Sequence, residues 1–335
     1  MTTDNKSIKF AFVAHVDHGK STIAGHLLYK VGYVSEHEMD ELKKKAESNK
    51  KKSWNYAYIL DILDEERQTG KTMDYNPIEF DYAGDHYCLV DNAGHQSLVR
   101  TLIAGLNYHE PKSTIGCLVV SLDNGEFEAG MKGGQTRESV KLLRGCGIEH
   151  LVVLLNKIDL VPIDTPRYQM VHDQVGKYIS KLGFKTVTFF PVSGYRGDNL
   201  VELLALLKKI SQEQIWSQSA NITNVDEEGK VAEVVRDKFP SIQVKIHHEE
   251  EFTKLITAGF QCIMHCGKRE YQVTVEKLRH WDVKEKKIIN RGPAAKNGDA
   301  VVFKLECEDK FVWDGCDRVI LRQDDHTIAF GKLYG

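Results

Sequence analysis

A turn that contains glycine, lysine and serine is the first feature of the sequence with clear chemical potential. The stretch Ala14-His15-Val16-Asp17-His18-Gly19-Lys20-Ser21-Thr22 follows an apolar run and precedes a helical one. Consecutive backbone N–H groups at a helix N-terminus form a concave anion site, and a lysine there adds a cation. The pattern predicts a phosphate-binding loop formed by Val16, Asp17, His18, Gly19, Lys20, Ser21 and Thr22. The general motif opens on glycine where this chain has Ala14, and the alternative is an ordinary strand-to-helix turn.

A second segment, Asp91-Asn92-Ala93-Gly94-His95, follows the apolar run Tyr87 to Val90. A carboxylate in this place can hold a Mg²⁺-bound water, and a glycine N–H can meet the outermost phosphate of a nucleotide. The hydroxyl of Ser21 is a direct Mg²⁺ ligand in such sites. We therefore expect Gly94 to bind the nucleotide, and Ser21 and Asp91 to bind Mg²⁺, Asp91 through water.

Two further segments have groups that distinguish one base from another. Asn156-Lys157-Ile158-Asp159 follows the run Leu151 to Leu155, and Ser193-Gly194-Tyr195 follows the run Val187 to Val192. A carboxylate accepts hydrogen bonds from two N–H groups on one edge of guanine, whereas adenine offers no such pair. The backbone of the Ser193 loop can meet the guanine O6. The sequence thus predicts GTP or GDP as the ligand, bound by Asn156, Lys157, Asp159, Ser193, Gly194 and Tyr195.

Short apolar runs position these segments in the first two thirds of the chain. Each run is typical of a buried strand followed by a turn and a helix: Ile8 to Val13, Tyr87 to Val90, Cys117 to Ser121, Leu151 to Leu155 and Val187 to Val192. This alternation predicts a mostly parallel sheet with helices on both faces. Pro77 to Tyr82 is predicted to be an edge strand that pairs back through Gly84, and Asn199 to Ile210 a closing helix. Ligands of open α/β sheets bind beyond the carboxyl ends of the strands, so we expect one shared site.

The last third of the chain has a different pattern. Residues 211 to 238 are polar and weakly periodic, which is typical of a linker. Short alternating runs follow without intervening helices, and they predict a small antiparallel barrel or sandwich. The runs are Ile242 to Ile246, Phe260 to Met264, Tyr271 to Val275, Val301 to Leu305, Arg318 to Leu321 and Thr327 to Phe330. We predict a nucleotide-binding domain over residues 1–222, a linker over 223–238 and a β-barrel over 239–335.

Composition sets limits on the remaining possibilities. The 335 residues carry 45 basic and 48 acidic side chains, a net charge of −3, so any nucleic-acid contact must be local and DNA is not an expected partner. No apolar run approaches the ~18 residues of a membrane span, so no membrane partner is expected. The seven cysteines include no Cys-x-x-Cys pair, and the N-terminus lacks a signal-peptide pattern, so we expect a cytoplasmic protein. Cys262, His265 and Cys266 alternate faces on a predicted strand, which disfavours a zinc site.

These motifs together resemble those of the translational GTPases. The phosphate loop is similar to that of elongation factors, and Asp91 to His95 resembles the family's Asp-x-Pro-Gly-His. Asn55-Tyr56-Ala57 through Glu66-Arg67-Gln68-Thr69-Gly70-Lys71-Thr72 resembles the first switch region of elongation factor 1-alpha, release factor 3 and the Pelota-partner rescue GTPases. Typical of that subfamily is also Gly125-Glu126-Phe127-Glu128-Ala129-Gly130 with Gly134-Gln135-Thr136-Arg137-Glu138.

The resemblance implies roles for particular residues. It implies that Thr72 joins Ser21 as a direct Mg²⁺ ligand and that His95 is catalytic, orienting the water that attacks GTP; the alternative for His95 is a solvated loop histidine. Two positions depart from the family pattern. Where the family has proline, this chain has Ala93, which makes the second switch less rigid. Lys71 replaces an apolar residue that, in the elongation factors, helps to screen the catalytic histidine from the nucleotide. The rate of hydrolysis without an activator is therefore left open.

The C-terminal third resembles the third domain of elongation factor 1-alpha, with Lys296-Asn297-Gly298-Asp299-Ala300 like its Lys-Ser-Gly-Asp-Ala turn. The family's middle barrel, which holds the aminoacyl end of tRNA, has no counterpart of sufficient length here. The resemblance implies a nucleotide-controlled translation factor with the ribosome as a partner, together with a release-factor-like or Pelota-like protein or tRNA. The alternatives are a regulatory GTP-dependent binding module that has left the ribosome and, less favoured, an aminoacyl-tRNA carrier.

A lysine-rich stretch lies between the phosphate loop and Thr72. It comprises Lys43-Lys44-Lys45 and Lys50-Lys51-Lys52, with Trp54 and Tyr56 close by. Such a run is most often a solvated helix face. The alternative is a salt-sensitive contact with ribosomal or transfer RNA.

Overall fold

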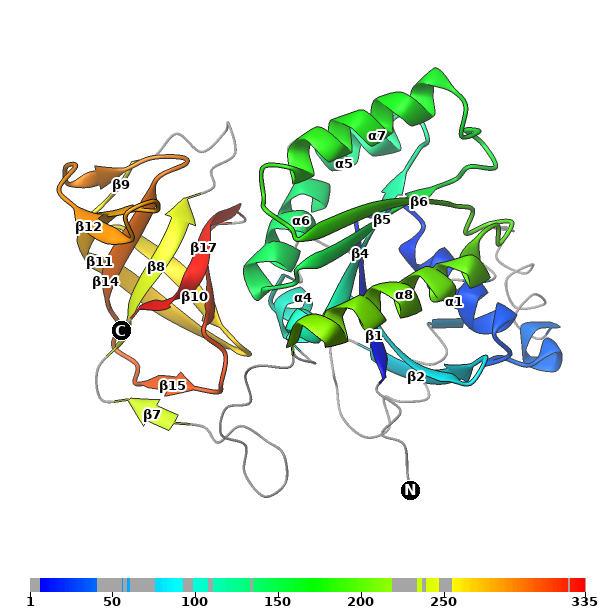
Figure 1. The fold of residues 1–335 in the computed structure, drawn as a ribbon, viewed down its shortest axis with the longest axis horizontal. Helices are drawn as coiled ribbons and strands as arrows, with labels where there is room; N and C mark the ends of the chain where they lie inside the picture. The colour runs from blue at the N-terminus through cyan, green and yellow to red at the C-terminus, as the bar shows by residue number, and fades with distance from the viewer. Residues whose placement is uncertain are drawn as a thin grey trace. The chain divides into compact units, whose positions relative to one another are not determined.

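The chain divides into two units, which are described separately. In the computed structural model, the described residues are 7–40, 56, 59–60, 76–92, 99–107, 111–132, 135–218, 234–236, 239–246, 255–324 and 326–334. The first unit comprises Met1–Arg144 with Ile148–Ser219, and the second comprises Gly145–Gly147 with Ala220–Gly335. Element labels follow Figure 1.

The first unit is built on a sheet of six described strands in the order β2-β3-β1-β4-β5-β6. All neighbours pair in parallel except β2, which pairs antiparallel with β3 around the turn at Ala83 and Gly84. The predicted edge strand is thereby confirmed. The strands are β1 (Ile8–Ala14), β2 (Asn76–Tyr82), β3 (Asp85–Asp91), β4 (Thr114–Ser121), β5 (His150–Asn156) and β6 (Thr186–Val192).

Helices cover both faces of this sheet (Figure 1). Every residue of β4 and β5 is buried, whichever face it points to, as expected when both faces are covered. A Cβ at Gly116 of β4 would lie 3.2 Å from the Leu143 side chain, so α6 packs on the face opposite to Cys117. The described helices are α1 (Lys20–Lys30), α4 (Val99–Leu106), α5 (Glu126–Met131), α6 (Gln135–Cys146), α7 (Pro166–Ile179) and α8 (Leu200–Gln218), with a 3₁₀ turn at Pro111–Ser113.

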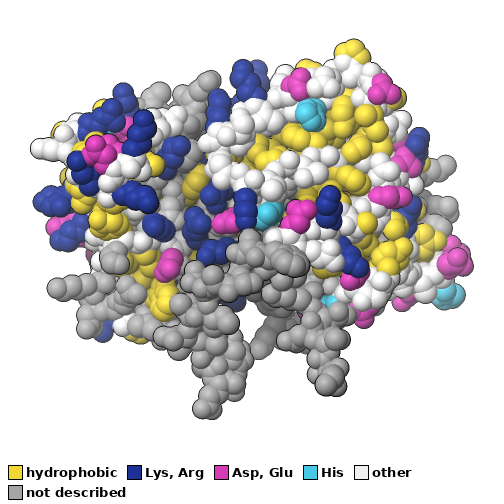
Figure 2. Space-filling model, viewed as in Figure 1, with side chains coloured by type: hydrophobic (Ala, Val, Ile, Leu, Met, Phe, Trp, Pro, Cys, Tyr) yellow, Lys and Arg dark blue, Asp and Glu magenta, His cyan; other side chains and the backbone are white. Residues whose placement is uncertain are grey.

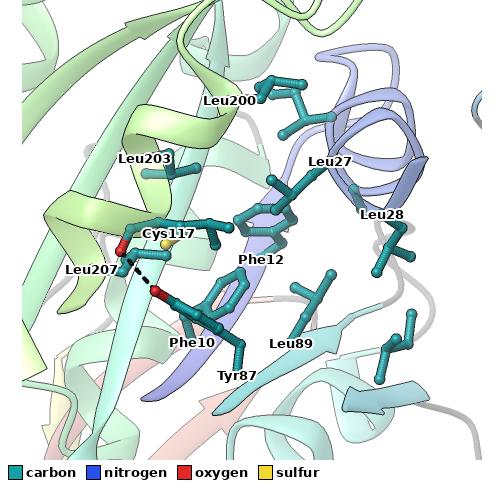
Figure 3. Close-up of a cluster of buried hydrophobic side chains, with 14 of the residues drawn as sticks. Phe10, Phe12, Leu27, Leu28, Tyr87, Leu89, Cys117, Leu200, Leu203 and Leu207 are labelled. Carbon is teal, nitrogen blue, oxygen red and sulfur yellow. Dashed lines mark hydrogen bonds between the residues drawn. The ribbon is translucent and has the colours of Figure 1, made fainter. Parts of the chain in front are cut away.

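The core between β1, α1 and α8 fixes the first strand and the first helix (Figure 3). Phe10 and Phe12 meet edge to face, with ring centroids 5.5 Å apart. Tyr87 donates to the Leu204 carbonyl at 3.5 Å, so its hydroxyl finds a partner inside the core. The other labelled side chains are Leu27, Leu28, Leu89, Cys117, Leu200, Leu203 and Leu207. Burial of these apolar groups sets where the turn between β1 and α1 must lie.

The strand register brings the predicted segments to one edge of the sheet. Phe12 pairs with Asp91, Ala14 with Val119, and Asn156 with both Ser121 and Val192. Parallel strands that end at matched positions place their following loops side by side. The phosphate loop, Asp91, Asn156 and Ser193 therefore lie at the same carboxyl edge.

The second unit is a closed antiparallel barrel, which confirms the predicted fold class. Its strands pair in the order β10-β16-β17-β8-β14-β11, and a further pairing of β10 with β11 closes the ring. Inward side chains such as Ile242, Phe303 and Phe311 form its core. The strands are β8 (Ser241–Ile246), β10 (Gln261–Cys266), β11 (Arg269–Asp282), β14 (Ala300–Glu306), β16 (Arg318–Gln323) and β17 (His326–Tyr334), and the short β12 (Lys287–Ile289) pairs antiparallel with the end of β11.

One expectation for the middle of the chain needs correction. Residues 211 to 218 belong to α8 instead of a linker. Within the predicted linker 223–238, β7 (Val234–Arg236) pairs antiparallel with β15 (Phe311–Trp313). A second short ribbon joins β9 (Ile256–Thr257) to β13 (Ala294–Ala295). These short strands depend on partners far away in the sequence, so local periodicity does not predict them.

The described helices and the visible surface bear on whether the chain has a membrane span or a charged face. In the part of the chain that the structure describes, no helix is long and apolar enough to cross a membrane. Figure 2 shows Lys and Arg side chains gathered on the visible face of the barrel, whereas hydrophobic side chains cover a larger visible area of the first unit.

Candidate nucleotide-binding site

The predicted phosphate loop is a tight turn with left-handed residues. Gly19, which precedes the first turn of α1, has φ 86°, and Asp17 has φ 65°. A side chain at Gly19 would collide with the Asn156 amide, so glycine is required both for the backbone conformation and for this close approach. Ser21 and Thr22 follow in the first turn of α1 and are partly exposed. The backbone N–H groups there point out of a helix N-terminus, which favours an anion.

Lys20, at the start of helix α1, and Asp91, at the end of strand β3, come together. Lys20 Nζ donates to Asp91 Oδ1 at 2.5 Å, and the lysine is buried. Because the register of β1 and β3 matches, the end of β3 delivers Asp91 beside the phosphate loop. The pair puts a cation and an oxygen ligand together at the mouth of the anion site.

His18 fastens the phosphate loop to its surroundings. The ring is fully buried, with Nδ1 3.2 Å from the Val119 carbonyl and Nε2 3.1 Å from the Glu126 carbonyl. Burial lowers the pKa of His18. The neutral ring has one N–H, so it donates to one of these carbonyls at a time. His18 therefore has a structural part in the predicted anion site, linking it to β4 and α5.

Asn156 connects the phosphate loop with the loop after β6. Its Nδ2 donates to the His18 carbonyl at 2.8 Å, and its Oδ1 accepts from the Gly194 N–H at 2.9 Å. Both polar ends of a buried amide are thus satisfied. One side chain at the end of β5 holds two predicted binding loops in register.

Lys157 and Asp159 follow on the same turn. Lys157 has φ 74°, and its Nζ contacts both oxygens of Glu126 at 2.5 and 2.6 Å. Burial acts to raise the pKa of Glu126, but hydrogen bonds from Lys157 and Ser121 outweigh it and lower that pKa. Glu126 therefore stays ionised and fixes the lysine at neutral pH. In the sequence, Glu126 belongs only to a subfamily pattern, and no motif predicts its contact with Lys157.

The Asp159 carboxylate is oriented by a neighbouring hydroxyl. Ser193 Oγ donates to Asp159 Oδ1 at 2.5 Å and accepts from the Arg196 N–H at 3.0 Å. The loop itself is tight, since the Gly197 N–H donates to the Ser193 carbonyl at 2.7 Å. Tyr195 lies at its tip with 58% of its surface exposed. Asp159, Ser193 and Tyr195 thus form one edge of the site.

A histidine of α1 that has no part in the predicted site lies behind this loop. His26 Nδ1 is 2.8 Å from the Gly194 carbonyl, and the ring stacks on Tyr56 at 3.8 Å between centroids. Lys30, one turn further along α1, donates to the Gly197 carbonyl at 2.7 Å. No motif in the sequence could have singled out a lone histidine inside a helix.

Several predicted functional residues fall outside the described residues. These are Thr72, Gly94 and His95, together with the departures Lys71 and Ala93 and the lysine-rich stretch Lys43–Lys45, Lys50–Lys52 and Trp54. Of the two switch regions, the structure describes Tyr56, Ile59, Leu60, Asp91 and Asn92. Tyr56 and Asp91 lie as stated above, and the buried Asn92 donates from Nδ2 to the Phe12 carbonyl at 3.2 Å.

The parallel sheet, with a Gly-Lys-Ser turn after its first strand and Asn156 to Asp159 after its fifth, defines a P-loop GTPase domain. The family model described as the elongation factor Tu GTP binding domain matches residues 5–213, and that of the elongation factor Tu C-terminal domain matches residues 234–334. The chain belongs to the elongation factor Tu family of GTPases. The two units are hereafter the GTPase unit and the barrel.

Curated relatives match the GTPase part of the chain. Elongation factor 1-alpha of Aeropyrum pernix is 42% identical over 195 residues, which are 57% of this chain and 44% of that protein. Elongation factor 1-alpha of Hyperthermus butylicus is 38% identical over 207 residues, 60% of this chain and 46% of that protein. The matched part thus spans less than half the length of these relatives.

Solved structures share the fold of the whole chain. The Saccharomyces cerevisiae Ski7 GTPase-like domain bound to GTP superposes with a TM-score of 0.71 at 16% identity, covering 97% of both chains. Translation elongation factor SelB from Methanococcus maripaludis, bound to a GTP analogue, gives a TM-score of 0.59 at 16% identity, covering 100% of this chain and 80% of that one. At these identities the likeness concerns the fold alone.

Proposed function

We propose that the protein binds and hydrolyses GTP and acts as a nucleotide-controlled switch on or near the ribosome, in the cytoplasm. The observation that carries the proposal is that the ends of β1, β3, β5 and β6 meet at one sheet edge, where Asn156 ties the phosphate loop to the loop after β6. Its amide bonds both the phosphate loop and the Gly194 N–H. A site held together in this way positions the phosphates and the base of one nucleotide at a fixed distance.

The donor set fits a guanine nucleotide. The carboxylate of Asp159, oriented by Ser193, suits the two N–H groups of guanine. The buried Lys20 and the start of α1 suit the phosphates. The proposed nucleotide contacts are those predicted from the sequence, with Gly94 contacting the outermost phosphate.

The same residues fit Mg²⁺, which is bound by hard oxygen ligands. The Ser21 hydroxyl and the Asp91 carboxylate lie on neighbouring segments, with Asp91 held by Lys20 at 2.5 Å. We propose that Ser21 and Thr72 would hold Mg²⁺ directly and Asp91 through water. The ion would supply charge stabilisation of the phosphates. His95 would orient the attacking water, and catalysis would come from this positioning and from electrostatics.

The domain organisation narrows the role. Residues 214–233 lie between the two matched domains, and α8 extends to Gln218, so little chain is left for another barrel. We propose a GTPase domain over residues 1–222, a connection over 223–238 and a barrel over 239–335, without a middle barrel. Absence of that barrel disfavours aminoacyl-tRNA delivery. A release-factor-like or Pelota-like protein partner is favoured over tRNA.

The test measures GTP turnover with and without ribosomes, using the release of inorganic phosphate as the readout. We expect binding of GDP in preference to ADP, stimulation of turnover by ribosomes, and loss of that stimulation in His95→Ala with GDP binding retained. His172→Ala, in α7, is the matched control and should behave as wild type. Lack of stimulation, or stimulation that survives His95→Ala, contradicts the proposal.

Sedimentation with ribosomes in a non-hydrolysable GTP analogue separates the alternatives. Co-sedimentation supports the ribosomal role, whereas GTP binding without co-sedimentation indicates a regulatory binding module. Binding of charged over uncharged tRNA would indicate an aminoacyl-tRNA carrier.

A further inference from the structure

His26 is buried behind the loop that follows β6. It lies in the middle of α1 with 4% of its surface exposed, and its Nδ1 is 2.8 Å from the Gly194 carbonyl. A carbonyl oxygen only accepts hydrogen bonds, so Nδ1 must carry the hydrogen. Burial lowers the pKa of His26, which keeps the ring neutral at pH 7. The ring is therefore a fixed single donor to one peptide carbonyl.

The orientation of that carbonyl decides where the next N–H points. A trans peptide is planar, with its C=O and the following N–H on opposite sides, and the described chain has no cis peptide. Anchoring the Gly194 carbonyl to His26 thus turns the Tyr195 N–H away from α1. A rotation of this one peptide would redirect the N–H.

The other backbone N–H groups of this loop already have acceptors. The Ser193 N–H donates to the Asp198 carbonyl and the Gly197 N–H to the Ser193 carbonyl. The Gly194 N–H donates to Asn156 Oδ1 and the Arg196 N–H to Ser193 Oγ. Within the described loop 193–197, the Tyr195 N–H is the one that the protein leaves available for a ligand.

One face of α1 supports the loop from behind. Side chains at Gly194 and Gly197 would collide with Ile23 and His26, respectively. Ile23, His26 and Lys30 are spaced three and four residues apart, so they project from the same helix face. Lys30 bonds the Gly197 carbonyl at 2.7 Å, three residues after the carbonyl that His26 holds.

We propose that His26 is a positioning residue for guanine recognition, which holds the Gly194 carbonyl so that the Tyr195 N–H is presented to the guanine O6. This inference rests on the proposed binding of guanine nucleotides. The ring also stacks on Tyr56 with an interplanar angle of 4°, which restrains it against rotation.

The test compares GDP with 6-thio-GDP in the full chain. The two nucleotides differ only at position 6, where sulfur is a weaker acceptor than oxygen, so their affinity ratio reports on that contact. We expect His26→Leu to weaken GDP binding about threefold to tenfold, the worth of one neutral hydrogen bond. The affinity for 6-thio-GDP should fall less, so the preference for GDP over 6-thio-GDP should decrease. His26→Asn, whose amide can place a donor where Nδ1 lies, should restore the preference.

The controls separate this inference from the function on which it depends. His172→Leu, a partly exposed histidine of α7, should leave both affinities unchanged, and far-ultraviolet circular dichroism checks that each variant is folded. The role of His26 is overturned if His26→Leu weakens the binding of both nucleotides equally, or if His26→Asn does not restore the ratio of the GDP and 6-thio-GDP affinities. In either case, GDP binding by the wild type stands. Absence of GDP binding in the wild type overturns both proposals.

Discussion

The two units of this chain are stabilised by different means. Polar side chains that join loops at the proposed binding site are prominent in the GTPase unit, whereas a closed apolar core is prominent in the barrel. In the GTPase unit, the central strands β4 and β5 are buried at every position, and at the carboxyl edge of the sheet side chains such as Asn156 and Ser193 bond the neighbouring loops. In the barrel, strands such as β8 alternate between inward apolar and outward polar residues, and the ring closes on itself. A single polar substitution should therefore change ligand binding in the first unit, whereas in the second a core substitution should change stability.

The GTPase unit should show the largest functional effect at Asp159. Asp159→Asn replaces an acceptor by an amide, so we expect GDP affinity to fall by about 10² to 10⁴-fold, the worth of two charge-assisted hydrogen bonds. Xanthosine diphosphate, which presents an acceptor at position 2, should gain affinity. Competition against a fluorescent GDP analogue measures both.

Asp164→Asn, an exposed carboxylate in the turn before α7, is the matched control. An Asp159→Asn protein that still prefers GDP to xanthosine diphosphate would show that another group reads the base.

The barrel should show the largest stability effect at Phe303. This side chain of β14 is fully buried, and its strand positions pair it with Leu278 and Ile242. Phe303→Ala leaves a cavity, and we expect a loss of about 3–5 kcal/mol in the free energy of unfolding of the barrel. Calorimetry should show the loss, with GDP affinity unchanged while the barrel is folded. Glu306→Ala, on the outer face of the same strand, should change neither the barrel stability nor the GDP affinity. A fall in GDP affinity for Phe303→Ala would contradict the expectation that the barrel core affects stability alone.

The sequence predicts the parallel sheet well because its signal is strong and local. Apolar runs of strand length bounded by turns leave little choice of element, and residues that follow strand ends must meet at one edge. The contacts of Lys20 with Asp91 and of Ser193 with Asp159 follow that expectation. The chemical roles assigned to these residues remain predictions.

The parts that the sequence does not predict depend on tertiary context. The second half of β11 lies beyond a bulge between Val275 and Lys277, which shifts the alternation by one residue and hides the strand. The strand β7 exists because it pairs with β15, over seventy positions away. The contact of His26 with the Gly194 carbonyl joins residues 168 positions apart, and no local pattern marks it.

The stability of the GTPase unit should depend on pH because three of its histidines have lowered pKa values. Burial lowers the pKa of His18, His26 and His150 below the usual 6.5. The unfolded chain then binds more protons than the folded one just below pH 6.5, so this stability is present above pH 6.5 and is lost as the pH falls. Denaturant unfolding followed by circular dichroism at 222 nm reports mainly on this unit, since it contains all the described helices except the last two residues of α6.

We expect the free energy of unfolding to fall between pH 7 and pH 5.5, before the carboxylates contribute. Burial is the largest cause of the lowered pKa of His150 in β5, whose Nδ1 lies 2.7 Å from Thr186 Oγ1. His150→Gln should therefore remove part of the slope with pH. A flat profile in the wild type over this range would contradict the expectation.

The smallest effect should come from a surface ion pair of the barrel. Lys277 of β11 lies opposite Lys304 of β14, an unfavourable pairing of like charges, and Glu276 contacts Lys304 Nζ at 2.6 and 2.8 Å. Glu276→Gln should cost about 0.2–1 kcal/mol in barrel stability, as is usual for exposed pairs, and the loss should shrink at high salt. A double-mutant cycle with Lys304→Met measures the coupling. A salt-independent coupling as large as the Phe303 effect would mean that surface charge, and not the closed apolar core, holds the barrel together.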